Sequence, residues 1–247
     1  MIDHDLIKRA LAEDLQGGED ITSVATVSGA EKVVADFVAR KAGVIAGIEM
    51  AKAVLVEVGL TDISVLVQDG GRVETGSVLL TVRGDTRAIL LAERTALNFL
   101  GHLSGIATLT RRWVDEVAGT QCAVRDTRKT TPGMRLLEKH AVRMGGGTNH
   151  RMSLSDAALI KDNHIAAAGG VVAAFSQVRA KFPSAPIEIE VDTLEQLKEV
   201  LPLKPDLVLL DNMSPQQCAE AVAIAAGRCK LEASGGITLE NAKSYAL

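Results

Sequence analysis

The stretch that decides the fold runs from residue 187 to residue 212 and reads IEIEVDTLEQLKEVLPLKPDLVLLDN. Two apolar, strand-like segments, Ile187 to Val191 and Leu207 to Leu210, enclose a segment with the apolar spacing of a helix, Leu194 to Val200. A strand, a helix and a second strand in this order are typical of a parallel sheet with a crossover helix. The stretch therefore predicts an α/β architecture for this part of the chain.

The same alternation continues on both sides of this stretch. Further strand-like runs are Cys122 to Val124, Ala157 to Ile160 and Lys230 to Ala233, and further helical patterns are Ile165 to Lys181 and Pro215 to Ala226. Five strands with their helices predict an α/β barrel or an open parallel sheet. No GxGxxG motif opens a helix here, and the glycines at 145–147 do not follow a strand, so a dinucleotide-binding fold is the weaker alternative.

The first hundred residues show no such alternation and predict an α+β domain. Helical patterns cover Asp3 to Leu15 and Ile48 to Val58, and strand patterns cover residues 32–48, Ile63 to Val67 and Val78 to Val82. A long helix is predicted from Asp85 to Val117, with a break at Gly101, Ser104 and Gly105, because each glycine costs a helix up to about 1 kcal/mol. The predicted domains are residues 1–105 and 106–247.

Composition excludes several classes of protein. The chain has 247 residues, 47% of them hydrophobic and 23% charged, with a net charge of −4 and no long apolar run, so we expect neither disorder nor a membrane span. Its three cysteines form no CxxC pair, and its first residues are acidic where a signal peptide is basic, so we expect a cytoplasmic protein. One Trp, one Tyr and four Phe, with negative net charge, argue against a nucleic-acid partner.

Charge is concentrated where ligands bind in such folds. Residues 125–151 hold seven Lys or Arg against two acids, inside an otherwise acidic chain. The ligand site of a parallel barrel lies at the carboxyl ends of its strands. Each strand-like run here ends in charged or polar residues, which are Arg125 to Lys129, Lys161 to His164, Glu188 with Glu190 and Asp192, Asp211 with Asn212, and Glu232 with Ser234.

These residue types indicate a site for phosphorylated and carboxylated ligands. Basic side chains bind phosphates and carboxylates, and carboxylates suit sugar hydroxyls or a divalent metal ion. Ser234-Gly235-Gly236 offers backbone N–H groups before a helix that we expect near Thr238, an arrangement that binds phosphate. A structural ion network that pairs Lys161 with Glu190 or Asp211 is the alternative interpretation.

The motifs together resemble those of the quinolinate phosphoribosyltransferase family over nearly the whole chain. They are Ala92-Glu93-Arg94-Thr95-Ala96-Leu97-Asn98, Asp126-Thr127-Arg128-Lys129-Thr130, Pro132-Gly133, Glu138-Lys139, Gly145-Gly146-Gly147 with Asn149-His150-Arg151, Leu159 to His164, Glu188 to Asp192, Leu209 to Asn212 and Glu232 to Ile237. The resemblance implies an N-terminal α+β sandwich domain followed by an incomplete α/β barrel of the type II phosphoribosyltransferase kind. It also implies transfer of phosphoribosyl from 5-phosphoribosyl-1-pyrophosphate to quinolinate, which yields nicotinate mononucleotide, pyrophosphate and CO₂ for NAD biosynthesis.

The resemblance also implies roles for residues. Lys129, Lys161, Glu190 and Asp211 are expected to be catalytic. Arg94, Thr127, Arg128, His150, Arg151, Ser234, Gly235 and Gly236 are expected to bind substrate, with Arg94 contributed across the interface of a homodimer or higher homo-oligomer. Glu190 and Asp211 are expected to hold Mg²⁺, directly or through substrate or water.

The family pattern continues for a further strand and helix beyond Leu247, so we expect the last layer of the barrel to be absent here. Three alternatives stay open at this stage. One is a related enzyme tied to molybdenum transport, which shares the Thr-Arg-Lys-Thr element but lacks the complete Lys161-Asp162-Asn163-His164 run. The others are a Schiff-base aldolase that uses Lys161 as nucleophile and a sensor that binds a phosphate ligand without turnover.

Overall fold

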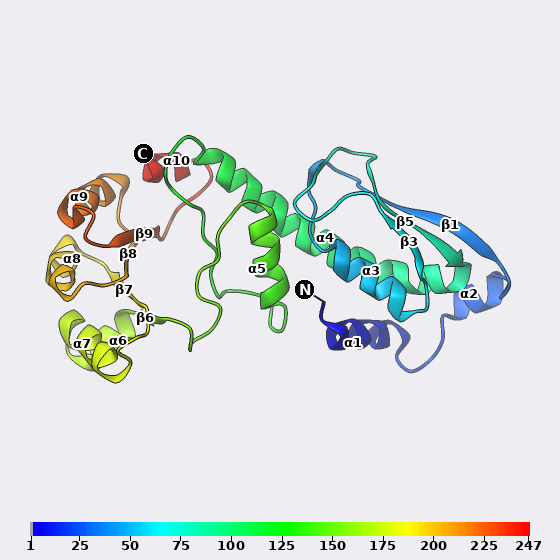
Figure 1. Cartoon of the computed structure of the whole chain (residues 1–247), viewed down its shortest axis with the longest axis horizontal. Helices are drawn as coiled ribbons and strands as arrows, with labels where there is room; N and C mark the ends of the chain where they lie inside the picture. The colour runs from blue at the N-terminus through cyan, green and yellow to red at the C-terminus, as the bar shows by residue number, and fades with distance from the viewer. Residues whose placement is uncertain (1) are drawn as a thin grey trace. The chain divides into compact units, whose positions relative to one another are not determined.

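The computed structural model describes residues 2–247, which form two compact units. The first unit comprises the residues up to Asp115 together with Ala123–Asn149, and the second comprises Glu116–Cys122 together with His150–Leu247. The N-terminal unit contains a small antiparallel sheet with helices, and the C-terminal unit contains a parallel sheet with helices (Figure 1). This mixed α/β architecture confirms the predicted fold class.

The N-terminal unit is built from a three-stranded antiparallel sheet in the order β1-β5-β3 and a two-stranded sheet of β2 and β4. Its elements are α1 (His4–Leu15), α2 (Ile21–Thr26), β1 (Lys32–Val38), β2 (Gly43–Val44), α3 (Ile48–Glu57), β3 (Asp62–Val65), β4 (Arg72–Val73), β5 (Val78–Asp85), α4 (Thr86–Glu116) and α5 (Arg135–Met144). Phe37, Leu80 and Val82 of the sheet share one buried core with α3 and α4.

The predicted break in the long helix is wrong, because α4 continues from Thr86 to Glu116 without interruption (Figure 1). A stripe that includes Ala92, Leu103 and Ala107 is fully buried along it. The Ser104 hydroxyl accepts from the Ala46 N–H at 3.0 Å, so the expected weak point is a tertiary contact. Burial of one face outweighs the cost of two glycines, and the helix therefore stays intact.

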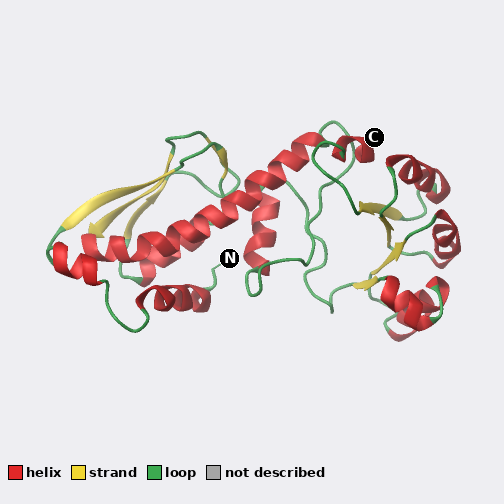
Figure 2. Cartoon of the chain, turned by 180° about the vertical axis from the view of Figure 1, so that it is seen from behind, coloured by secondary structure: helices red, strands yellow, loops and turns green. Residues whose placement is uncertain are grey.

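The C-terminal unit is a four-stranded parallel sheet in the order β6-β7-β8-β9. Its elements are β6 (Ala158–Ile160), α6 (Asp162–Ala168), α7 (Val171–Lys181), β7 (Ile187–Val191), α8 (Leu194–Val200), the 3₁₀ turn η1 (Leu201–Leu203), β8 (Leu207–Asp211), α9 (Pro215–Ala225), β9 (Lys230–Ser234) and α10 (Ala242–Ala246). Helices α7, α8 and α9 cover one face of the sheet (Figure 2), where their apolar residues meet those of the strands.

Three details differ from the expectation. The segment from Cys122 to Val124 is not a strand, since only an isolated bridge joins Arg125 to Thr148 in this region. The helical pattern from Ile165 to Lys181 is two helices, because Gly169 and Gly170 both have positive φ angles and end the first. The last helix begins at Ala242 rather than near Thr238.

The predicted domain boundary after residue 105 lies within α4 and stays a prediction. Within residues 2–247, the structure contains no helix with both the length and the apolar character needed to cross a membrane.

Candidate active site

Strand β7 presents acids on one face and apolar residues on the other. Ile187, Ile189 and Val191 are completely buried in the core beneath the helices. Because side chains alternate along a strand, Glu188 and Glu190 point to the opposite face of the sheet. Both glutamates are buried, which is rare for a carboxylate without a partner.

Glu190 is paired with Lys161, the residue that follows β6. The Lys161 Nζ lies 3.0 Å from the Glu190 Oε2, and the lysine side chain is 48% exposed while the glutamate side chain is 10% exposed. The Lys161 ammonium group is therefore accessible to solvent, and the more buried Glu190 carboxylate fixes its position. The structure brings these two predicted catalytic residues into direct contact, as the alternative of an ion network also anticipated.

Asp211 ends β8 and lies opposite Ser234, the last residue of β9. Just beyond this pair, the Asn212 N–H donates to the Ser234 carbonyl at 2.9 Å and so joins the ends of the two strands. Gly235 has a φ of +90°, and a Cβ on it would lie 2.1 Å from the Asn212 Oδ1. Only glycine fits this position, which explains the first glycine of the motif.

The predicted phosphate loop is present, although no helix begins directly behind it. Among residues 2–247, the N–H groups of Gly235 and Gly236 have no hydrogen-bond acceptor, and a Cβ on Gly236 would meet open space. The five-residue helix α10 begins only at Ala242, so a helix dipole does not supplement these two amides. Open backbone amides at the carboxyl edge of a parallel sheet are suited to bind an anion.

His150 and Arg151 form a second hydrogen-bonded group in the C-terminal unit, together with Glu188. The His150 Nε2 lies 2.6 Å from the Glu188 Oε2, and both side chains are buried. The Arg151 N–H donates to the His150 Nδ1 at 2.8 Å, and the Arg151 Nη1 donates to the Ala157 carbonyl at 2.9 Å. Arg151 is thus held at its main chain and at its guanidinium.

Sequence analysis counted Glu188 and Glu232 among the charged strand residues at the expected ligand site but assigned neither of them a role. Ligand atoms of His150, Glu188 and Glu232 lie within 4.8 Å of one another, a spacing that metal sites also show. The 2.6 Å contact between His150 and Glu188 is a hydrogen bond, and it leaves no gap for an ion between those two atoms. The cluster is therefore better described as a polar network than as a metal site.

Two predicted cationic site residues of the N-terminal unit, Arg128 and Lys129, lie on one loop. Side chains of α5 bind this loop at both of its ends. The buried Lys139 Nζ lies 2.5 Å from the Asp126 Oδ1, just before the loop. The Thr131 N–H donates to the Glu138 Oε2 at 3.1 Å, just after it. Between these anchors, the Lys129 N–H donates to the Thr127 Oγ1 at 3.0 Å.

Arg128 on this loop has an unsatisfied donor. Its Nε is buried and has no hydrogen-bond partner among the described residues 2–247. A buried donor without an acceptor costs about 1–3 kcal/mol, and an incoming carboxylate would remove that cost. This atom supports the predicted role of Arg128 as an anion-binding residue.

Glu138 shows how the loop anchor is held in its charged form. Burial opposes ionisation of this carboxyl, but hydrogen bonds from Thr131 and from the His102 Nε2 at 2.8 Å outweigh it and lower the pKa of Glu138. His140 pairs with Asp69, its Nε2 lying 2.7 Å from the Asp69 Oδ2.

Arg94 lies on α4, apart from the loop in sequence and exposed to solvent. Leu90 and Leu97, which are 38% and 37% exposed, share its face of the helix, because residues three and four apart are neighbours there. This is an exposed apolar face with one central arginine.

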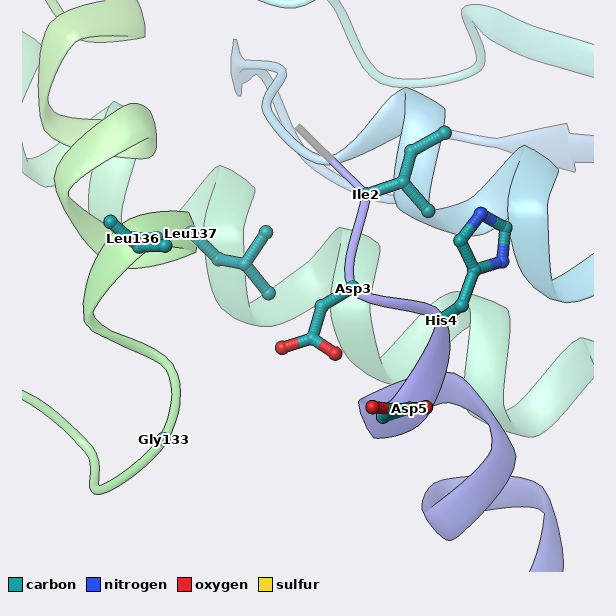
Figure 3. A pocket seen from close by; sticks show the side chains of 7 residues that line it. All are labelled: Ile2, Asp3, His4, Asp5, Gly133, Leu136 and Leu137. Atoms are coloured by element: carbon teal, nitrogen blue, oxygen red, sulfur yellow. The ribbon is translucent and has the colours of Figure 1, made fainter.

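A cavity of about 260 Å³ in the N-terminal unit is lined by Ile2, Asp3, His4, Asp5, Gly133, Leu136 and Leu137 (Figure 3). None of the predicted site residues lines it. Asp3 accepts from the Leu6 N–H at 2.9 Å and so caps helix α1. Its acidic lining is unsuited to a ligand rich in carboxylates or phosphates.

The carboxyl edge of the parallel sheet carries a lysine–glutamate pair, an aspartate and an open glycine turn. This combination suits an α/β enzyme that acts on anionic, phosphorylated ligands. The model of the quinolinate phosphoribosyl transferase N-terminal domain matches residues 20–104, and that of the C-terminal domain matches residues 106–247. The chain belongs to the quinolinate phosphoribosyltransferase family.

Similar proteins agree with this assignment. The nicotinate-nucleotide pyrophosphorylase (carboxylating) of Mycobacterium leprae is 53% identical over 248 residues, which cover 98% of this chain and 87% of that protein. The solved structure of NadC from Streptococcus pyogenes matches with a TM-score of 0.94 at 40% identity, over 98% of this chain and 86% of that one. The nicotinate-nucleotide pyrophosphorylase from Francisella tularensis matches with a TM-score of 0.95 at 37% identity, over 100% and 89%.

Proposed function

We propose that this chain transfers the phosphoribosyl group of 5-phosphoribosyl-1-pyrophosphate to quinolinate and releases pyrophosphate and CO₂. The product is nicotinate mononucleotide, an intermediate of NAD biosynthesis. The observation that carries the proposal is the match of almost the whole chain to carboxylating nicotinate-nucleotide pyrophosphorylases. The carboxyl edge of the parallel sheet supports it, because acids, a lysine and open amides gather there.

Quinolinate carries two adjacent carboxylates, and we assign the cations Arg128, Arg151 and Lys161 to them, with His150 beside Arg151. Arginine binds a carboxylate through two parallel hydrogen bonds, so it fixes orientation as well as charge. The buried, unpartnered Nε of Arg128 and the two-point attachment of Arg151 support this role. Thr127 orders the loop that carries Arg128, through its bond with the Lys129 N–H.

We assign the ribose hydroxyls to Glu190 and Asp211 and the 5′-phosphate to Ser234, Gly235 and Gly236. The open N–H groups of the two glycines support the second assignment. Hard carboxylate oxygens fit Mg²⁺, which proteins bind through one or two carboxylates together with substrate phosphates. Glu190 and Asp211 would hold Mg²⁺, directly or through substrate or water. When bound, Mg²⁺ neutralises charge on the pyrophosphate.

The reaction exchanges one bond at the ribose and then one at the ring. The quinolinate nitrogen forms a bond with ribose C1′ while the bond from C1′ to the pyrophosphate oxygen breaks. Positive charge develops on the ribose in that step, and the carboxylates of Glu190 and Asp211 stabilise it. Lys129 stabilises the departing pyrophosphate. The alkylated ring then accepts the electron pair left by CO₂, and the carbon takes up a proton.

The proposal includes a homodimer or a higher homo-oligomer in which Arg94 completes the neighbour's site. The exposed leucines at 90 and 97 support an interface on this face of α4, since they flank Arg94. The proposal also places the protein in the cytoplasm, because a sparse, odd set of three cysteines without a CxxC pair suits a reducing compartment.

One assay tests the proposed activity. The purified chain receives quinolinate, 5-phosphoribosyl-1-pyrophosphate and Mg²⁺, and the release of CO₂ and nicotinate mononucleotide is measured. Nicotinate replaces quinolinate as the control acceptor. Equal amounts of CO₂ and mononucleotide with quinolinate, and no product with nicotinate, are expected. Binding of both substrates without turnover would instead show a sensor.

A further inference from the structure

Each ring nitrogen of His150 has a hydrogen-bond partner in the C-terminal unit. Its Nδ1 accepts the main-chain N–H of Arg151 at 2.8 Å, and its Nε2 lies 2.6 Å from the Glu188 Oε2. The ring is 8% exposed. Both ring nitrogens therefore already have a protein partner, and the side chain is buried.

The contacts fix which nitrogen carries the proton. Only an unprotonated Nδ1 can accept the Arg151 N–H, so the ring proton lies on Nε2 and is donated to Glu188. The carboxylate thereby selects one tautomer of a neutral ring, as carboxylates do behind many histidines that must keep a fixed orientation. Glu188 thus acts on the Arg151 main chain through the ring.

The residues in register with Glu188, Leu159 on β6 and Leu207 on β8, are both apolar and do not require a carboxylate there. On its own face, ligand atoms of His150 and Glu232 lie within 4.8 Å of a Glu188 carboxylate oxygen. The second oxygen of Glu188, Oε1, is buried and has no hydrogen-bond partner among residues 2–247. A buried carboxylate with one unsatisfied oxygen is costly, and an apolar side chain would avoid that cost. This cost indicates that the carboxylate of Glu188 is present for its hydrogen bond to His150 rather than for packing.

We propose that Glu188 is a positioning residue that, through the His150 ring, holds the main chain of Arg151 and so aims its guanidinium at a carboxylate of the substrate. The Ala157 carbonyl holds the other end of Arg151, at 2.9 Å. This inference rests on the proposed function only in naming quinolinate as the carboxylate. It gives His150 an indirect role, in place of the direct contact that the family resemblance implies.

The first test needs no substrate and measures the tautomer in the full chain. The ring nitrogens of ¹⁵N-labelled His150 and the exchange of the Arg151 amide proton are followed by NMR. Wild type shows a protonated Nε2, a bare Nδ1 and a protected amide. Glu188→Gln keeps an acceptor and preserves this pattern, whereas Glu188→Ala gives mixed tautomers and exchange of the Arg151 amide at least about tenfold faster.

Glu195→Ala is the matched control, because Glu195 is an acid on the exposed side of α8 and 3.9 Å from Lys198. It leaves the His150 pattern unchanged. A protonated Nδ1 in wild type, or an unchanged tautomer and unchanged Arg151 exchange in folded Glu188→Ala, overturns the proposal.

The second test separates an indirect from a direct role of His150. Asn places its side-chain oxygen near the position of Nδ1 and can accept the Arg151 N–H, whereas Gln places its amide near the position of Nε2. His150→Asn is expected to bind quinolinate about tenfold more tightly than His150→Gln, by calorimetric titration. Glu188→Ala is expected to raise the KM for quinolinate about tenfold, with kcat and the KM for 5-phosphoribosyl-1-pyrophosphate within about twofold of wild type.

Equal or weaker binding by His150→Asn overturns the indirect role. If wild type binds no quinolinate, the proposed function fails, while the NMR experiment still decides whether Glu188 and His150 hold Arg151.

Discussion

The buried pair of Lys139 and Asp126 gives the sharpest stability prediction. Their side chains are 0% and 7% exposed, and the Nζ and Oδ1 lie 2.5 Å apart. Lys139→Met removes the cation but leaves Asp126 buried, and breaking such a pair costs about 3–5 kcal/mol. The Asn149 Nδ2 still donates to the Asp126 Oδ2 at 2.5 Å, so we expect the lower end, about 3 kcal/mol.

Trp113 makes this prediction measurable, since it is the only tryptophan of the chain and lies on α4 in the N-terminal unit. Its fluorescence follows urea unfolding of that unit. With a slope of about 2 kcal/mol per molar urea, the midpoint falls by about 1.5 M. The control Lys198→Met breaks an exposed pair at 3.9 Å and shifts the free energy of unfolding by less than about 0.5 kcal/mol.

A double variant distinguishes charge from packing. Asp126→Asn removes the buried charge, so in combination with Lys139→Met it is expected to recover at least about half of the lost stability. A loss below about 1 kcal/mol in Lys139→Met, or a double variant no more stable than the single one, refutes the reasoning.

Four further predictions follow from the site. Lys161→Ala keeps the fold, measured by circular dichroism, and lowers kcat/KM roughly 10²-fold; near wild-type kinetics contradict its assignment. Arg94→Ala alone is inactive, but activity returns when it is mixed with Lys161→Ala subunits; proven subunit mixing without rescue argues against a shared site. Gly235→Ala raises the KM for 5-phosphoribosyl-1-pyrophosphate about tenfold, because its Cβ would meet Asn212, while quinolinate binding measured by titration is unchanged. The pKa of Glu138 is lowered on folding, so ionised Glu138 stabilises the folded chain above about pH 4.3, and this stabilisation is lost as pH falls through the folded pKa. Glu138→Gln is therefore expected to make the Tm less dependent on pH in that range. An unchanged pH dependence of the Tm refutes the role of Glu138 as a charged loop anchor.

The elements that could be predicted are those whose pattern is local. The alternation in Ile187 to Val191 and the helix of Leu194 to Val200 appear in the structure with the predicted bounds. The charged residues at the ends of β6 and β8 and within β7 follow from the same pattern, and they place Lys161, Asp211 and Glu190 in the C-terminal unit. Hydrophobic periodicity depends only on neighbouring residues, so it is visible in the chain itself.

The errors occur where distant contacts outweigh local preference. Gly101 and Gly105 weaken a helix, but the buried stripe of α4 and the Ser104 contact with Ala46 keep it continuous. Cys122 to Val124 has strand-like composition, yet it is irregular in the structure. A strand needs a partner strand along its length, and no short segment specifies one by itself.

The sequence alone determined the class of architecture, the family and most of the residue types in the site, because apolar periodicity and motif spacing are properties of the chain. Only the tertiary structure decided which acid serves which base: Glu190 faces Lys161, whereas Glu188 faces His150. The two glutamates are chemically identical and two positions apart on the same face. Their roles differ because segments far away in sequence bring a lysine to one and a histidine to the other.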